Sequence, residues 1–148
     1  MVDGEARAAL AAALESVLER MFFIDTGSAA GSEVPDGEVP VRARLTFEGD
    51  PPGWLTLEVS PPAARSIAAD FLAVDEASLS AGQVEEVVCE LANMICGAAL
   101  SRLESDSNFR LGAPGVLEGR PAPDAAAIVG SADLGNGILM ARLKFQAT

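Results

Sequence analysis

The longest uninterrupted pattern in the sequence is an amphipathic helix, which we expect to run from Ser80 to about Ser105. Ser80 and Gln83 form a capping-box sequence, in which the hydroxyl accepts a helix N–H and the amide reaches back to the cap. Apolar side chains recur at the spacing of one helix face, namely Val84, Val87, Val88, Leu91, Ile95, Ala98 and Ala99. A helix with such a face must lie against a sheet or against other helices.

The rest of the chain alternates between helical and strand patterns. Helical spacing predicts a first helix over residues 5–24 and a short helix that begins at Pro61 and Pro62. Alternating apolar residues predict strands over residues 39–48, 54–59, 125–132 and 138–146, with one or two short strands within 108–118. The order α-β-β-α-α-β-β-β indicates an α+β (layered α/β) fold with a largely antiparallel sheet.

Three further expectations concern organisation. A chain of 148 residues is the size of one domain, so we expect a single domain over residues 1–148, with a flexible loop at 28–40 that is rich in Gly, Ser, Pro and Asp. Asn136 and Gly137 favour a hairpin between the last two strands. The first half of the last strand is apolar on both faces, which predicts a central position or an exposed edge that pairs two copies into a homodimer.

The charge and composition exclude several classes of function. The chain has 10 Lys and Arg, 22 Asp and Glu, no His and a formal net charge of −12. Such a surface repels nucleic acid and anionic membranes. Without His, the commonest general base and zinc ligand are missing, so we expect no metal site and chemistry based on carboxylates, amides, hydroxyls or thiols. No secretory signal or membrane-length apolar run is present, which predicts a cytoplasmic protein.

The two cysteines, Cys89 and Cys96, lie seven residues apart on the long helix. That spacing is about 10 Å of helical rise, which is too far for a disulfide. We interpret both as small, partly buried apolar side chains. Thiol or redox chemistry is therefore the least favoured function for this chain.

A polar line lies opposite the apolar face of the long helix. Its members are spaced four, three, four and four residues apart, and they are Glu86, Glu90, Asn93, Gly97 and Ser101. A polar line is also what any amphipathic helix presents to solvent. A mid-helix glycine costs about 1 kcal/mol relative to alanine, so Gly97 indicates close approach either of a neighbouring helix or of another molecule.

The segment EVVCELANMICG, residues 86–97, resembles the signature helix of the CheC/CheX/FliY chemotaxis phosphatases. In that helix a Glu is followed three residues later by Asn and then by Met or Ile and Gly. A single copy of the motif makes the chain more similar to CheX than to CheC. Two positions depart from the family pattern, since Glu86 replaces the usual Asp or Ser and Pro114 falls slightly early.

The resemblance implies a phosphatase that removes the aspartyl phosphate of a CheY-like receiver domain in chemotaxis or two-component signalling. Glu90 would pair with the receiver's lysine and Asn93 would hold the attacking water, while Glu86, Gly97 and Ser101 would contact the partner. No cofactor is expected on this chain, and Mg²⁺ is expected on the receiver. The resemblance also implies a homodimer. The alternative is a non-catalytic module of the same fold that docks on a receiver domain or another signalling protein.

Overall fold

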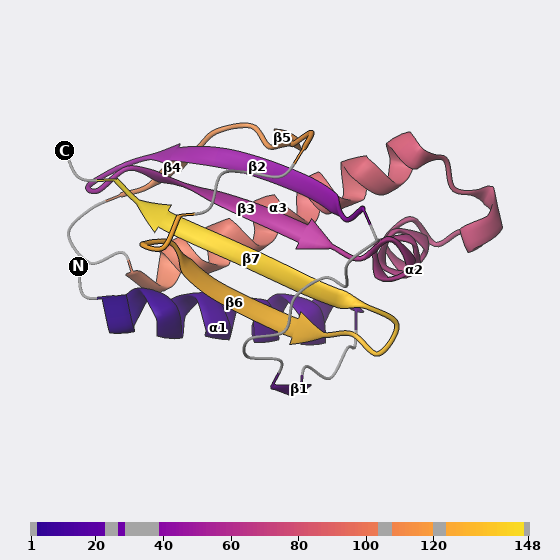
Figure 1. The fold of residues 1–148 in the computed structure, drawn as a ribbon, viewed down its shortest axis with the longest axis horizontal. Helices are drawn as coiled ribbons and strands as arrows, with labels where there is room; N and C mark the ends of the chain where they lie inside the picture. The colour runs from indigo at the N-terminus through magenta and orange to yellow at the C-terminus, as the bar shows by residue number, and fades with distance from the viewer. Residues whose placement is uncertain (1–2, 23–26, 29–38, 104–107, 120–123, 147–148) are drawn as a thin grey trace.

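A seven-stranded sheet forms the centre of the computed structural model, which describes residues 3–22, 27–28, 39–103, 108–119 and 124–146 (Figure 1). The elements in chain order are α1 (Asp3–Phe22), β1 (Gly27–Ser28), β2 (Val41–Glu48), β3 (Gly53–Val59), α2 (Pro61–Leu72), the short 3₁₀ helix η1 (Glu76–Ser78), α3 (Ala81–Leu103), β4 (Arg110–Leu111), β5 (Gly115–Val116), β6 (Ile128–Asp133) and β7 (Ile138–Phe145). The predicted α+β class and the predicted order of the main elements are confirmed.

The strands follow the order β1-β6-β7-β3-β2-β4, with β5 also paired to β2, and every pairing is antiparallel. The last strand, β7, therefore lies between β6 and β3 and has no exposed edge. This placement explains why the first half of β7 is apolar on both faces. The expectation that β7 itself offers an edge to a second copy is wrong, because both of its neighbouring positions are occupied within the chain.

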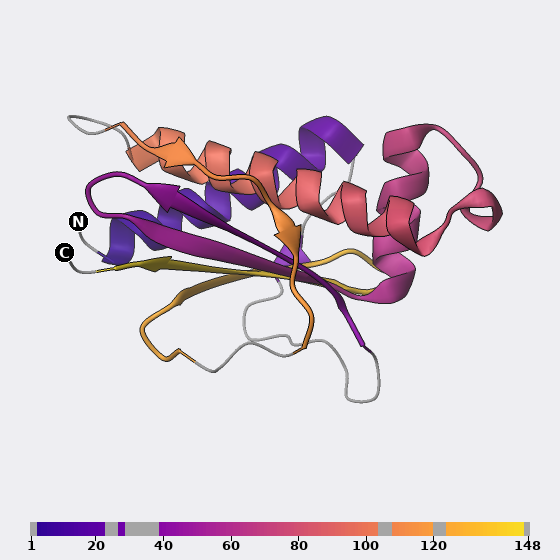
Figure 2. The same cartoon turned by 90° about the horizontal axis from the view of Figure 1, so that it is seen from above.

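Helices α1 and α3 cover one face of the sheet, and α2 lies beyond one end of it (Figure 2). The core fills the space between helices and sheet. At its centre Leu45, Leu55 and Leu143 lie in register across β2, β3 and β7 and are almost completely buried. Gly130 of β6 allows α1 to lie close, because a Cβ at this position would be 2.9 Å from Leu14 Cδ1. Residues that alternate with these inward positions face away from the helices.

Local sequence signals fix several boundaries. The predicted capping box is confirmed, since the Gln83 N–H donates to Ser80 Oγ at 3.1 Å and the Ser80 N–H donates to Gln83 Oε1 at 2.9 Å. Strand β6 starts later than predicted because Asp124 Oδ1 accepts the Ala126 N–H at 2.9 Å, which forms a turn. Strand β1 and helix η1 were not predicted, and residues 29–38 of the predicted loop lie outside the described residues.

The predicted hairpin between β6 and β7 is confirmed, but for a different reason. The positive φ in the turn, 87°, is at Gly135 rather than at Gly137. The Gly135 N–H donates to Asp133 Oδ1 at 2.9 Å. Gly137 is needed for space, because a Cβ there would lie 2.7 Å from the Cβ of Ser60. The start of α2 therefore lies so close to this turn that position 137 requires a glycine.

Candidate functional site

The outward face of α3 presents the polar line that the sequence predicts. The predicted apolar stripe is buried, except for Ala98, which is half-buried. On the opposite side Glu86, Glu90 and Ser101 are exposed, and Asn93 and Gly97 are half-buried. We call these five residues the α3 polar line.

Glu90 and Asn93 form the central pair of the α3 polar line. They are three residues apart, which places them about 4.5 Å from each other along the axis and on one side of the helix. Within the described residues, neither side chain makes a hydrogen bond or an ion pair. A carboxylate and a carboxamide are therefore both available to another molecule at this point of the surface.

The outer members of the line lie farther from this pair. Gly97 follows Asn93 by about 6 Å along the axis, whereas Ser101 is about 12 Å beyond Asn93 and Glu86 about 10 Å before it. The structure thus brings Glu90, Asn93 and Gly97 together. Glu86 and Ser101 lie at the two ends of the α3 polar line.

Gly97 is not required by packing within the described part of the chain. A Cβ built there would meet only Leu111 Cδ2, at 3.9 Å, which is ordinary van der Waals contact. The described residues therefore give no support to the alternative that Gly97 admits a neighbouring helix. The space above this glycine is open on the side where Asn93 and Glu90 also lie.

A wall beside the α3 polar line is formed by residues 110–116, which carry β4 and β5 and run alongside α3 (Figure 2). Backbone hydrogen bonds hold this segment to β2, from the Gly112 N–H within the wall to the Thr46 carbonyl at 2.8 Å and from the Leu117 N–H directly after it to the Arg42 carbonyl at 3.0 Å. Val116 in this wall is 46% exposed. The short strands predicted within residues 108–118 are confirmed as β4 and β5, but their position beside the α3 polar line was not predicted.

The two thiols are unsuited to nucleophilic or redox chemistry. Cys89 and Cys96 are both free, and Cys96 is completely buried. Burial raises the pKa of Cys96 to about 12. The pKa of Cys89 is also raised, first by burial and then by the negative charges of Glu85, Glu90 and Glu86. Because the thiolate is the reactive form, these pKa shifts argue against thiol chemistry.

Among the described residues, no three His, Cys, Asp or Glu side chains come together in a way that could hold a metal ion. None of the described helices combines the length and the apolar character needed to cross a membrane.

The fold is that of chemotaxis proteins of known structure. CheX from Vibrio vulnificus superposes with a TM-score of 0.73 at 17% identity, covering 99% of both chains. CheX from Desulfovibrio desulfuricans gives 0.71 at 18% identity, covering 96% of this chain and 99% of that one. CheX in the CheX-CheY-BeF3-Mg+2 complex from Borrelia burgdorferi gives 0.74 at 15% identity, covering 95% and 97%. At these identities the similarity establishes the fold.

The sequence itself establishes the family. Residues 41–129, more than half of the chain, match the family model for the chemotaxis phosphatase CheX. This range contains the whole of α3 and both short strands of the wall. The chain therefore belongs to the CheX family of chemotaxis phosphatases, as its resemblance predicted. No curated protein matches the chain.

Proposed function

We propose that this protein acts in the cytoplasm as a phosphatase that hydrolyses the aspartyl phosphate of a CheY-like receiver domain. The observation that carries the proposal is the pair Glu90 and Asn93, which lie side by side on an exposed helix and have no partners in the described part of the chain. Membership of the CheX family supports the activity. The Borrelia burgdorferi complex of CheX with CheY supports the kind of partner.

The proposed chemistry requires positioning rather than a strong base. Water attacks the phosphorus of the aspartyl phosphate, the bond from phosphorus to the aspartate oxygen breaks, and inorganic phosphate and a free carboxylate leave. The Asn93 carboxamide, which can both donate and accept hydrogen bonds, holds the water in line for this attack. Mg²⁺ bound to the receiver would neutralise charge on the phosphoryl group. The reaction therefore needs neither a histidine nor a metal on this chain.

The α3 polar line and the wall define the docking surface of the proposal. Glu90 pairs with a lysine of the receiver, and Glu86 adds a second negative charge at the rim. Open space at Gly97 lets the receiver approach the helix backbone. Val116 and Leu111 supply apolar contact beside the polar line, which is the arrangement typical of protein interfaces.

The experiment that tests this function measures the lifetime of an acyl-phosphorylated receiver domain in Mg²⁺, with and without the protein. Binding to the same receiver is measured in parallel. Faster decay in the presence of the protein supports the phosphatase. Failure to shorten the lifetime of any phosphorylated receiver that the protein binds contradicts it.

The second candidate is a binding module that docks without hydrolysis. The specific observation in its favour is Glu86, an exposed carboxylate where the resemblance leads us to expect Asp or Ser. Its longer side chain adds a charge that holds a receiver at the rim of the site. Tight binding together with an unchanged phosphoryl lifetime would favour this module.

We also propose a homodimer that forms through an outer edge of the sheet. Since β7 is internal, pairing would use the β1–β6 edge or the β4–β5 edge. Among the described residues, strand β1 pairs with Ala132 and Asp133 of β6. Light scattering at micromolar concentration tests this proposal, and a monomeric mass would contradict it.

A further inference from the structure

The face of the sheet that points away from α1 and α3 carries a block of mostly polar side chains on β2, β3 and β7. The block has three rows in register across the strands, which are Arg42–Glu58–Met140, Arg44–Thr56–Arg142 and Thr46–Trp54–Lys144. Because neighbouring residues of a strand point to opposite faces, all nine side chains lie on the side opposite the core leucines. We call this set the outer-face block.

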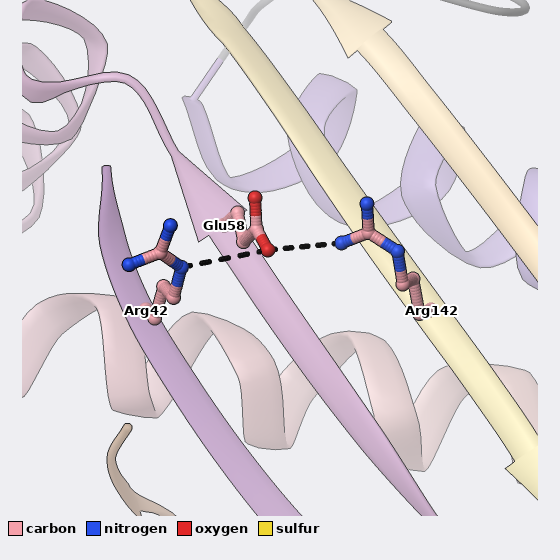
Figure 3. A network of polar contacts seen from close by, with 3 residues as sticks. All are labelled: Arg42, Glu58 and Arg142. Carbon is pink, nitrogen blue, oxygen red and sulfur yellow. Dashed lines mark hydrogen bonds and ion pairs between the residues drawn. The ribbon is translucent and has the colours of Figure 1, made fainter. Parts of the chain in front are cut away.

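Positive charge in the outer-face block is only partly compensated. Glu58 Oε1 lies 3.5 Å from Arg42 Nε and 3.0 Å from Arg142 Nη1, so two guanidinium groups share one carboxylate (Figure 3). Lys144 Nζ lies 3.3 Å from Asp124 Oδ1. The Arg44 guanidinium lies 4.9 Å from the centre of the Trp54 ring.

No carboxylate pairs with Arg44 in the part of the chain that the structure describes. Among the described residues, the four cations of the block therefore pair with two carboxylates, which leaves an excess of two positive charges. This excess stands out in a chain with a formal net charge of −12. Partly buried charge without a counter-ion is unfavourable, so the block is suited to an anion.

Thr56 provides a second, independent observation. Thr56 is 1% exposed, and its hydroxyl has no hydrogen-bond partner among the described residues. A buried hydroxyl without a partner lowers stability, and such groups in native proteins require an explanation. The residues directly opposite Thr56 on the two neighbouring strands are Arg44 and Arg142. The unpartnered hydroxyl therefore belongs to the strand between the two arginine positions, while the Arg44 guanidinium lies over Trp54 and that of Arg142 lies on Glu58.

We propose that Arg44, Thr56 and Arg142 form a binding site for a phosphate group. Guanidinium groups bind phosphate oxygens through paired N–H donors, and the Thr56 hydroxyl supplies a further donor from the strand between the two arginines. A phosphate dianion matches the excess of two positive charges. The side chains of Arg142 and Lys144 are 29% and 23% exposed, so the site is reached from solvent past their ends. The site lies across the sheet from α3 and does not rest on the proposed phosphatase activity.

Trp54 is the only tryptophan of the chain and lies in the same block, so its fluorescence reports on the site. The full chain is titrated with inorganic phosphate and with adenosine monophosphate, at constant ionic strength set by sodium chloride. We expect a saturable change for phosphate. Equal affinity for both ligands assigns the site to phosphate alone, and tighter binding of the nucleotide assigns it to a phosphate within a nucleotide.

Thr56→Val is the decisive variant, because it keeps the shape of the side chain and removes the hydroxyl. We expect it to weaken phosphate binding about tenfold or more without lowering the melting temperature in the absence of phosphate. Arg110→Gln removes an exposed arginine outside the block and should leave binding unchanged. No saturable change with either ligand, or unaltered affinity in Thr56→Val, would overturn the proposal.

Discussion

Gly97 of α3 and Leu111 of β4 lie next to each other without touching tightly, since a Cβ on Gly97 would be 3.9 Å from Leu111 Cδ2. Contacts within the described part of the chain do not explain a glycine in the middle of this helix, because a larger side chain would fit there. The proposed docking surface supplies an explanation, because the partner's backbone can approach the helix at this point.

The variant Gly97→Ala tests that explanation through two opposite effects. Alanine fits beside Leu111 and favours the helix, so the free energy of unfolding should rise by about 1 kcal/mol. Affinity for a receiver carrying beryllium fluoride should fall about tenfold, because the added methyl group stands where the partner approaches. Chemical denaturation and calorimetric binding measure the two effects. A stabilised variant with unchanged affinity would show that the glycine does not serve docking.

The wall beside α3 gives a prediction with a closely matched control. Val116 is 46% exposed in the wall, and Val129 is 42% exposed on the outer face of β6. Val116→Asp should weaken receiver binding about tenfold or more, because it places a charge within an apolar contact. Val129→Asp, a change of the same chemistry at similar exposure, should keep the affinity within about twofold. If the two substitutions weakened receiver binding equally, the wall would not be part of the docking surface.

The buried thiol of Cys96 predicts a loss of stability at high pH. Its pKa is raised to about 12 in the folded protein from an ordinary value of 9.0. The stabilisation is complete below pH 9, and it is lost between pH 9 and 12 because the unfolded chain releases the proton first. At pH 10 the free energy of unfolding should be about 1.4 kcal/mol lower through this group.

Urea denaturation at pH 8 and pH 10 measures the effect, with Cys96→Val as the control of similar size. The wild type should lose more stability between the two pH values than the variant does. Identical losses would mean that the Cys96 thiol ionises as easily in the folded protein as in the unfolded one.

Patterns that act within one element were enough to predict much of the fold. The apolar stripe and the capping box of Ser80 and Gln83 located α3, and the same periodicity separated the α3 polar line from the core. The hydrogen bonds of that box close within four residues, so no distant part of the chain decides them. The motif from Glu86 to Gly97 then indicated the family.

Features that depend on distant contacts were not predicted. The position of β7 between β3 and β6 follows from the pairing of three separate segments, and alternation alone does not choose among neighbours. Gly137 looked like a turn residue, but its role depends on Ser60, which is 77 positions away. The outer-face block likewise exists only once β2, β3 and β7 lie side by side.

Asn93 is proposed to position the attacking water, and the decay of an acyl-phosphorylated receiver in Mg²⁺ tests this role most directly. Wild type, Asn93→Ala and Ser101→Ala are compared at saturating receiver concentration, where a weaker docking contact no longer limits the rate. Ser101 is the control because it belongs to the same docking surface but lies about 12 Å along the helix from Asn93. We predict that Asn93→Ala binds the receiver but loses the acceleration by a factor of about 100 or more. Ser101→Ala should retain it. An Asn93→Ala variant as active as the wild type would contradict the mechanism.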